Sequence, residues 1–156
     1  MKRLDIKPSD IPLAGHISVI VRNYAIYFNR EILPLKITSA QIPYLMILSD
    51  MGVLTQDELS GILFIDKGTV ARSLQKLEDN GFISRTPDPD NRRKNLVFLT
   101  EKGKSILPRI RDIDRKWGEA ICEGLTEEER SQLFSNIYKL AKNSLENLAC
   151  EGDQNE

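Results

Sequence analysis

Residues 55–103, TQDELSGILFIDKGTVARSLQKLEDNGFISRTPDPDNRRKNLVFLTEKG, decide the fold of this chain. Thr55 lies three residues before Glu58, a spacing that forms a capping box and predicts the start of a short helix. Asp66 is a favourable N-cap residue and predicts a second helix. Gly81 is placed to end that helix in a left-handed conformation. The stretch therefore begins with two short helices in succession.

The second predicted helix, residues 66–80, has a buried side and an outward side. Val70, Leu74 and Leu77 recur at i, i+4 and i+7, which places them on one apolar stripe. The side chains left on the outward side are basic or polar: Lys67, Thr69, Arg72, Gln75 and Lys76. A helix of this kind suits the reading of bases in the DNA major groove.

The pattern then changes from helical to β-prone. Residues 82–86 and 95–100 are short β-prone runs, and residues 87–94, PDPDNRRK, predict a turn between them. Three consecutive basic residues lie in this turn: Arg92, Arg93 and Lys94. We therefore predict a hairpin with a cationic tip after the two helices, which makes a winged helix-turn-helix. Such a tip can enter a minor groove or straddle phosphates.

Longer helices are predicted on both sides of this unit. Residues 12–32 carry apolar side chains with a 3.6-residue period: Ile17, Ile20, Val21, Tyr24, Ala25, Phe28 and Ile32. A shorter helix, capped by Thr38 or Ser39, follows and ends near Met51. Residues 1–11 are expected to form a loose arm.

Two more amphipathic helices are predicted after the hairpin. Thr100 is expected to cap the first of them, and Pro108 inside it predicts a bend. Thr126 and Glu129 form a capping box for the last helix, and the acidic residues 151–156 are expected to be a disordered tail. The predicted fold class is mainly α, an α+β winged helix-turn-helix with six helices and a two-stranded β wing.

The flanking helices, residues 12–33 and 104–150, carry more apolar surface than a small winged lobe of residues 38–103 can cover. We expect them to pack on each other and on a second copy of the chain, within one domain of residues 1–156. A two-fold dimer would also place two recognition helices roughly 34–36 Å apart, about one turn of DNA.

The overall charge does not favour nucleic-acid binding. The net charge is −1, and residues 38–99 hold seven basic and eight acidic side chains. The prediction of DNA binding therefore depends on where the positive charges lie, because salt screens charges beyond ~10 Å. No apolar run approaches the ~18 residues of a membrane span, and the N-terminus lacks the apolar region of a signal peptide. We expect a cytoplasmic protein with no membrane partner.

Two motifs resemble those of a known family. Asp90-x-Arg92 followed by LVFLT-x-x-Gly103 is similar to the wing signature of the MarR family, the multiple antibiotic resistance regulators. DKGTV at residues 66–70, followed by Leu74 and Leu77, resembles the recognition helix of that family. The resemblance covers nearly the whole chain. It implies a homodimeric, ligand-responsive transcriptional regulator, a repressor by family analogy, that binds a pseudo-palindromic DNA operator.

The resemblance also implies roles for individual residues. The residues expected to contact DNA are Lys67, Thr69, Arg72, Lys76, Asp90, Arg92, Arg93 and Lys94. Thr69 and Arg72 would read bases, and Lys76 would contact a phosphate. Arg92 would be the minor-groove arginine, with Asp90 holding its guanidinium. The simpler interpretation of each position alone is a solvated surface.

An effector site is implied by the same resemblance, since small aromatic ligands of the family lie between the dimer helices and the DNA-binding lobe. His16 and Tyr44 are therefore candidate contacts to a small aromatic or anionic effector. As alternatives, His16 is a partly exposed helix-end residue and Tyr44 a core or interface aromatic.

The alternative functions are a protein-interaction module, a redox-responsive regulator and an enzyme. A winged helix can also serve as a protein-interaction module, which near-neutral charge favours. A redox-responsive regulator would use Cys122 or Cys150, although Glu146 and Glu151 near Cys150 disfavour a reactive thiolate. The sequence has no phosphate-binding loop, nucleophile elbow or metal-ligand spacing, so we expect no enzyme activity, no cofactor and no metal.

Overall fold

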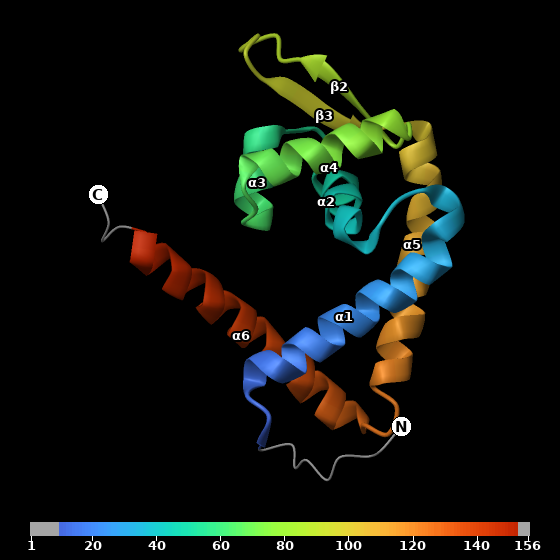
Figure 1. Cartoon of the computed structure of the whole chain (residues 1–156), viewed down its shortest axis with the longest axis vertical. Coiled ribbons are helices and arrows are strands. Elements are labelled where there is room, and N and C mark those ends of the chain that lie inside the picture. Colours follow the sequence, from blue (N-terminus) through green and yellow to red (C-terminus); the bar gives the residue numbers. More distant parts are fainter. Residues whose placement is uncertain (1–9, 153–156) are drawn as a thin grey trace. The chain divides into compact units, whose positions relative to one another are not determined.

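The structure is a computed structural model that describes residues 10–152 and the side chains of residues 10–147. The chain divides into two compact units, Met1–Trp117 and Gly118–Glu156. The α-helices of the described residues are α1 (Leu13–Ile32), α2 (Ile42–Met51), α3 (Gln56–Leu63), α4 (Lys67–Asp79), α5 (Glu101–Ile121) and α6 (Glu127–Gly152) (Figure 1). The second unit holds α6 and the end of α5.

The winged unit begins where the sequence predicts. The Glu58 N–H donates to Thr55 Oγ1 at 3.2 Å, and the Thr55 N–H donates to Glu58 Oε2 at 2.7 Å, so the predicted capping box starts α3. Asp66 caps α4, and Gly81 follows that helix with a φ of +74°. Val70, Leu74 and Leu77 are fully buried, which confirms the predicted stripe.

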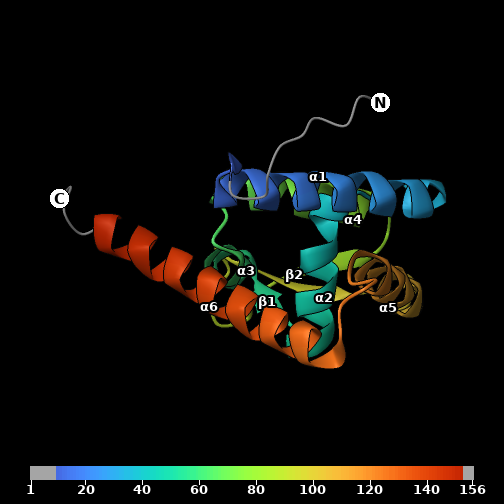
Figure 2. The same ribbon diagram turned by 90° about the horizontal axis from the view of Figure 1, so that it is seen from below.

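The wing belongs to a sheet of three strands rather than the two that were predicted. Its strands are β1 (Leu54–Thr55), β2 (Ile83–Pro87) and β3 (Asn95–Leu99), in the antiparallel order β1-β3-β2. β1 was not predicted, because two residues are too few to show a strand pattern. In the structure Leu54 of β1 pairs with Val97 of β3, and β1 leads directly into α3 (Figure 2). The start of the helix-turn-helix is thereby hydrogen-bonded to the base of the wing.

The first turn of α5 is attached to the end of α4. The Thr100 hydroxyl donates to the Gly81 carbonyl at 2.7 Å and accepts from the Gly103 N–H at 3.0 Å, as expected of a cap. Gly103 is buried against Phe82. The helix continues unbroken through Pro108, and the bend expected there stays a prediction.

The core of the first unit lies among α1 to α5 and the sheet. Its largest fully buried side chains are Tyr44, Phe28, Phe82, Ile32, Leu45, Leu59, Leu74, Leu77, Ile83 and Ile110. Thr38 caps a short 3₁₀ turn, η3 (Ser39–Gln41), which leads into α2. The N-terminal half of α1 adds little to this core, because Ile17, Ile20 and Val21 are about half exposed or more.

The chain ends depart in part from expectation. Residues 1–9 of the predicted arm and residues 153–156 of the predicted tail lie outside the described residues. The tail was predicted to begin at residue 151, which is wrong, since α6 extends to Gly152. Among the described helices, none is by itself long and apolar enough to span a membrane; Leu13–Leu35 and Ser39–Met51 pass only as a pair bent by 85°.

Candidate nucleic-acid interface

The N-terminus of α4 is exposed to solvent and is capped by Asp66. Asp66 accepts a hydrogen bond from the Thr69 N–H at 2.9 Å. Hydrogen bonds from Thr69 hold the pKa of the Asp66 carboxyl below its usual range, so this group is ionised at neutral pH. The capped first turn presents Lys67 and Thr69 at the end of the helix that a major groove would admit.

The outward side of α4 gathers three of the predicted DNA contacts. Arg72 Nη2 donates to Thr69 Oγ1 at 2.7 Å, which aligns the guanidinium along the helix surface. Thr69, Arg72 and Lys76 then line one side of a hollow of about 180 Å³, whose other side is formed by Thr38 and Gln41. Two cations and the hydroxyls of Thr38, Thr69 and Ser73 around one hollow are suited to phosphate oxygens and base edges.

Arg85 on β2 was missed by the sequence analysis. It ion-pairs with Glu78 of α4, and its Nη2 donates to Gln75 Oε1 at 2.5 Å. The Gln75 amide in turn donates to Asp79 at 2.8 Å. Side-chain contacts therefore fix the wing to the recognition helix. Gln75, predicted only as an outward-facing residue, accepts one of these hydrogen bonds from Arg85. No sequence signal identifies Arg85, because its partners lie on another element.

The tip of the wing is shaped by two short acceptor side chains. Asp88 Oδ1 accepts from the Asp90 N–H at 2.9 Å, and Asn91 Oδ1 accepts from the Arg93 N–H at 3.2 Å. These turns leave the Arg92 side chain exposed, as a minor-groove arginine requires. Within the described chain Asp90 and Arg92 form no ion pair, and their predicted pairing stays a prediction.

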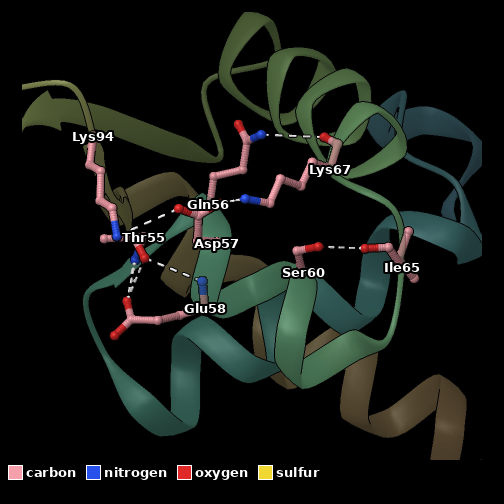
Figure 3. Close-up of polar contacts among 8 residues, drawn as sticks. All are labelled: Thr55, Gln56, Asp57, Glu58, Ser60, Ile65, Lys67 and Lys94. Atoms are coloured by element: carbon pink, nitrogen blue, oxygen red, sulfur yellow. Dashed lines mark hydrogen bonds and ion pairs between the residues drawn. The ribbon is translucent and has the colours of Figure 1, made fainter. Parts of the chain in front are cut away.

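Lys67 and Lys94, both predicted to contact DNA, meet at one carboxylate. Asp57 Oδ1 lies 2.7 Å from Lys67 Nζ, and Asp57 Oδ2 lies 3.5 Å from Lys94 Nζ (Figure 3). The hydrogen bond from Lys67 is the main cause that lowers the pKa of Asp57. From the sequence Asp57 is only one of the acidic residues, because its contact with both lysines depends on α3, α4 and the wing turn meeting in space.

Comparison with known proteins decides the family. Residues 37–94 match the family model described as MarR. The chain is 32% identical over 127 residues to the uncharacterized HTH-type transcriptional regulator YybA of Bacillus subtilis (strain 168), covering 81% of this chain and 85% of the relative. The crystal structure of MarR superposes with a TM-score of 0.85 at 34% identity, over 93% of this chain and 99% of that one. The chain belongs to the MarR family.

Other MarR-family structures agree. A MarR transcriptional regulator from Methanosarcina mazei Go1 is 37% identical, with a TM-score of 0.82 over 86% of this chain and 96% of that one. A cysteine-to-serine mutant of MarR from E. coli, complexed with operator DNA, is 28% identical with a TM-score of 0.75, over 88% and 99% of the two chains. The MarR-family chain described here is therefore a DNA-binding transcriptional regulator and not an enzyme.

The candidate effector contacts occupy different environments on this MarR-family fold. Tyr44 of α2 is 1% exposed and is part of the core, whereas His16 of α1 is half-buried. Cys122 is a buried free thiol, and the Cys150 side chain lies outside the described residues. Among the residues described, no group of three or more His, Cys, Asp or Glu could hold a metal ion.

Proposed function

We propose that this chain acts as a homodimeric repressor that binds a pseudo-palindromic operator and is released by a small aromatic or anionic effector. The exposed outward side of α4 carries the proposal. Thr69 and Arg72 would read base edges in the major groove, and Lys76 would hold the adjacent phosphate. Arg92 would enter the minor groove from the wing, as expected for an exposed arginine at a hairpin tip.

The apolar surface of α1 supports the homodimer. Each of its exposed hydrophobic side chains is at least 47% exposed: Leu13, Ile17, Val19, Ile20, Val21 and Ile26. In the second unit, α6 also exposes large apolar groups: Phe134, Ile137, Tyr138 and Leu140. Each of these exposed apolar faces, taken by itself, is typical of a partner interface, and a two-fold dimer would cover the same face on both copies.

An effector would act by favouring one spacing of the two recognition helices. Whatever its binding site, an effector that lowers DNA affinity must itself bind less tightly to the DNA complex by the same factor. Trp117, the single tryptophan, packs on Tyr27 at 5.2 Å between ring centroids and on Tyr24 at 6.0 Å. This cluster joins α1 to α5, so its fluorescence reports on helices that the family resemblance places at the effector site.

The first experiment is a footprint on the DNA upstream of the coding region, repeated over a salt series. We expect protection of ~20 base pairs with two-fold symmetry and an affinity that falls steeply with salt. Light scattering of the free protein should give twice the chain mass of 17.8 kDa. A monomer at micromolar concentration would refute the dimer. Weak, salt-insensitive binding would favour the protein-interaction module instead.

Repression and effector release need separate tests. Adding the protein to a transcription reaction on the footprinted promoter should lower transcript yield, and an increase would show activation. Salicylate-type compounds should then change Trp117 fluorescence and reduce DNA affinity together. If neither quantity changes for such compounds, the proposed effector class is wrong, while the operator assignment stands on the footprint alone.

A further inference from the structure

Asp57 is an acidic side chain that lies between two lysines of the DNA-facing surface. It lies in the first turn of α3, and its two carboxylate oxygens contact different lysines, Lys67 of α4 and Lys94 at the end of the wing turn (Figure 3). Both lysines remain accessible, with side chains 70% and 44% exposed. One carboxylate therefore holds two cations that the family resemblance implies would contact DNA.

The position of Asp57 is set by the backbone on both sides. The Thr55–Glu58 capping box fixes the first turn of α3. The Gln56 side-chain amide donates to the Lys67 carbonyl at 3.3 Å and ties the start of α4 to that turn. Because these contacts do not involve the Asp57 carboxylate, the surface should keep its shape when the carboxylate is replaced.

The ion pairs themselves add little to folding. All three side chains are at least 42% exposed, and exposed pairs of this kind contribute little to stability. Their effect should instead appear when DNA approaches, because a phosphate competes for the same two ammonium groups and is repelled by the carboxylate. Asp57 thus opposes the phosphate contacts that supply nearly all sequence-independent affinity.

We propose that Asp57 determines specificity by holding Lys67 and Lys94 in ion pairs that suppress binding to DNA of arbitrary sequence. This rests on the proposed reading surface. On an operator, base contacts by α4 and the wing set the register, so the two lysines can stay on Asp57. Without base contacts, binding depends on every available cation, and sequestering two of them weakens the complex.

The test is Asp57→Asn, which keeps the side-chain size and removes the charge. Affinity is measured for the footprinted operator and for a scrambled duplex of equal length over a salt series. We expect scrambled DNA to bind roughly 3- to 10-fold tighter, with a salt slope steeper by up to ~2, and the operator affinity to change by less than about 2-fold. The ratio of the two affinities therefore falls.

Two further variants separate a local effect from a general change of charge. Asp50→Asn makes the same charge change at a residue paired with Arg111 of α5, at 3.7 Å, and should leave the affinity ratio unaltered. In a Lys67→Gln, Lys94→Gln background, Asp57→Asn should lose most of its effect on scrambled DNA. Thermal melts of each variant establish that it is folded.

The possible outcomes point in different directions. If Asp57→Asn raises the affinity for both duplexes equally, Asp57 is a simple repulsive charge. If it weakens operator binding, Asp57 is a positioning residue. Either result overturns the proposal, and so does an unchanged affinity for both duplexes. If the wild-type chain protects an operator and Asp57→Asn binds both duplexes as the wild type does, the role of Asp57 is refuted and the proposed function is unaffected. A wild-type chain that binds no duplex overturns both.

Discussion

The contact between Gly103 and the base of the wing gives the sharpest stability prediction. A Cβ built on Gly103 would lie 2.0 Å from the Phe82 carbonyl oxygen and 3.2 Å from Leu99 Cδ2. Real Cβ contacts are essentially never shorter than 3.0 Å, so Gly103→Ala must move α5 or the 81–82 turn by about 1 Å. The nearest obstacle is the Phe82 backbone, which cannot rotate away as a flexible side chain can.

The size of the effect follows from three contributions. Overpacking of a close contact costs about 1–3 kcal/mol. The Phe82 carbonyl also accepts the Thr100 N–H at 3.1 Å, and weakening that bond adds about 1 kcal/mol. Replacing glycine by alanine in a helix returns at most about 1 kcal/mol. We expect a net loss of about 1–4 kcal/mol, which corresponds to a fall in Tm of roughly 2–16 °C.

Chemical denaturation followed by Trp117 fluorescence, at fixed protein concentration, measures this change. The matched control is Gly61→Ala in α3, where the added Cβ has no atom within 4 Å and should stabilise by about 0.5–1 kcal/mol. If Gly103→Ala is as stable as the parent chain or more stable, α5 does not approach the wing base as described. Destabilisation by both alanines would instead point to a general intolerance of these helices.

Three further perturbations test separate parts of the molecule. Arg92→Ala should weaken operator binding by about 1–3 kcal/mol, measured by titration of labelled duplex, without changing the dimer mass; unaltered affinity would contradict the wing assignment. Tyr24→Phe removes a 2.6 Å hydrogen bond from the tyrosine hydroxyl to Asp114 and should cost about 1–2 kcal/mol in urea denaturation, whereas no loss would show that the bond contributes nothing net. The lowered pKa of Asp66 means that its stabilising charge is fully present above the unfolded-state value, about 3.9, and is lost as pH falls through the lower folded value. Asp66→Asn should therefore lose less stability than the parent chain between pH 5 and pH 2, and parallel losses would argue against the cap.

Local signals predicted the elements of the reading surface well. Helix ends depend on contacts between residues three or four positions apart, so they can be predicted from local sequence. This holds for the capping boxes at Thr55 and Thr126, the Asp66 cap and the glycine at position 81. The buried stripe of α4 follows from spacing alone. The wing turn was also placed correctly between β2 and β3, because its prolines and aspartates are a local turn signal.

Contacts between elements could not be predicted in this way. The two residues of β1 become a strand only because β3 lies beside them, and Arg85 pairs with Glu78 only because β2 packs along α4. The 3.6-residue apolar period of α1 was predicted from the sequence. The period does not distinguish the side chains buried within a single chain from those left exposed on its surface. Phe28 and Ile32 are in the core, whereas Ile17 stays exposed on the same helix.

The near-neutral net charge counted against DNA binding. The contacts that the acidic side chains make explain why the lobe can still bind DNA. Glu58 caps α3, Asp66 caps α4, and Glu78 is paired with Arg85. Within the described chain, Lys76 and Arg92 form no ion pair. The Glu78–Arg85 pair carries no net charge, and the positive end of the helix dipole partly offsets the charge of the two capping acids. The cations of the outward α4 side and the wing tip then act on DNA almost as if the lobe were basic, and Asp57 is the acid on that surface placed to limit their effect.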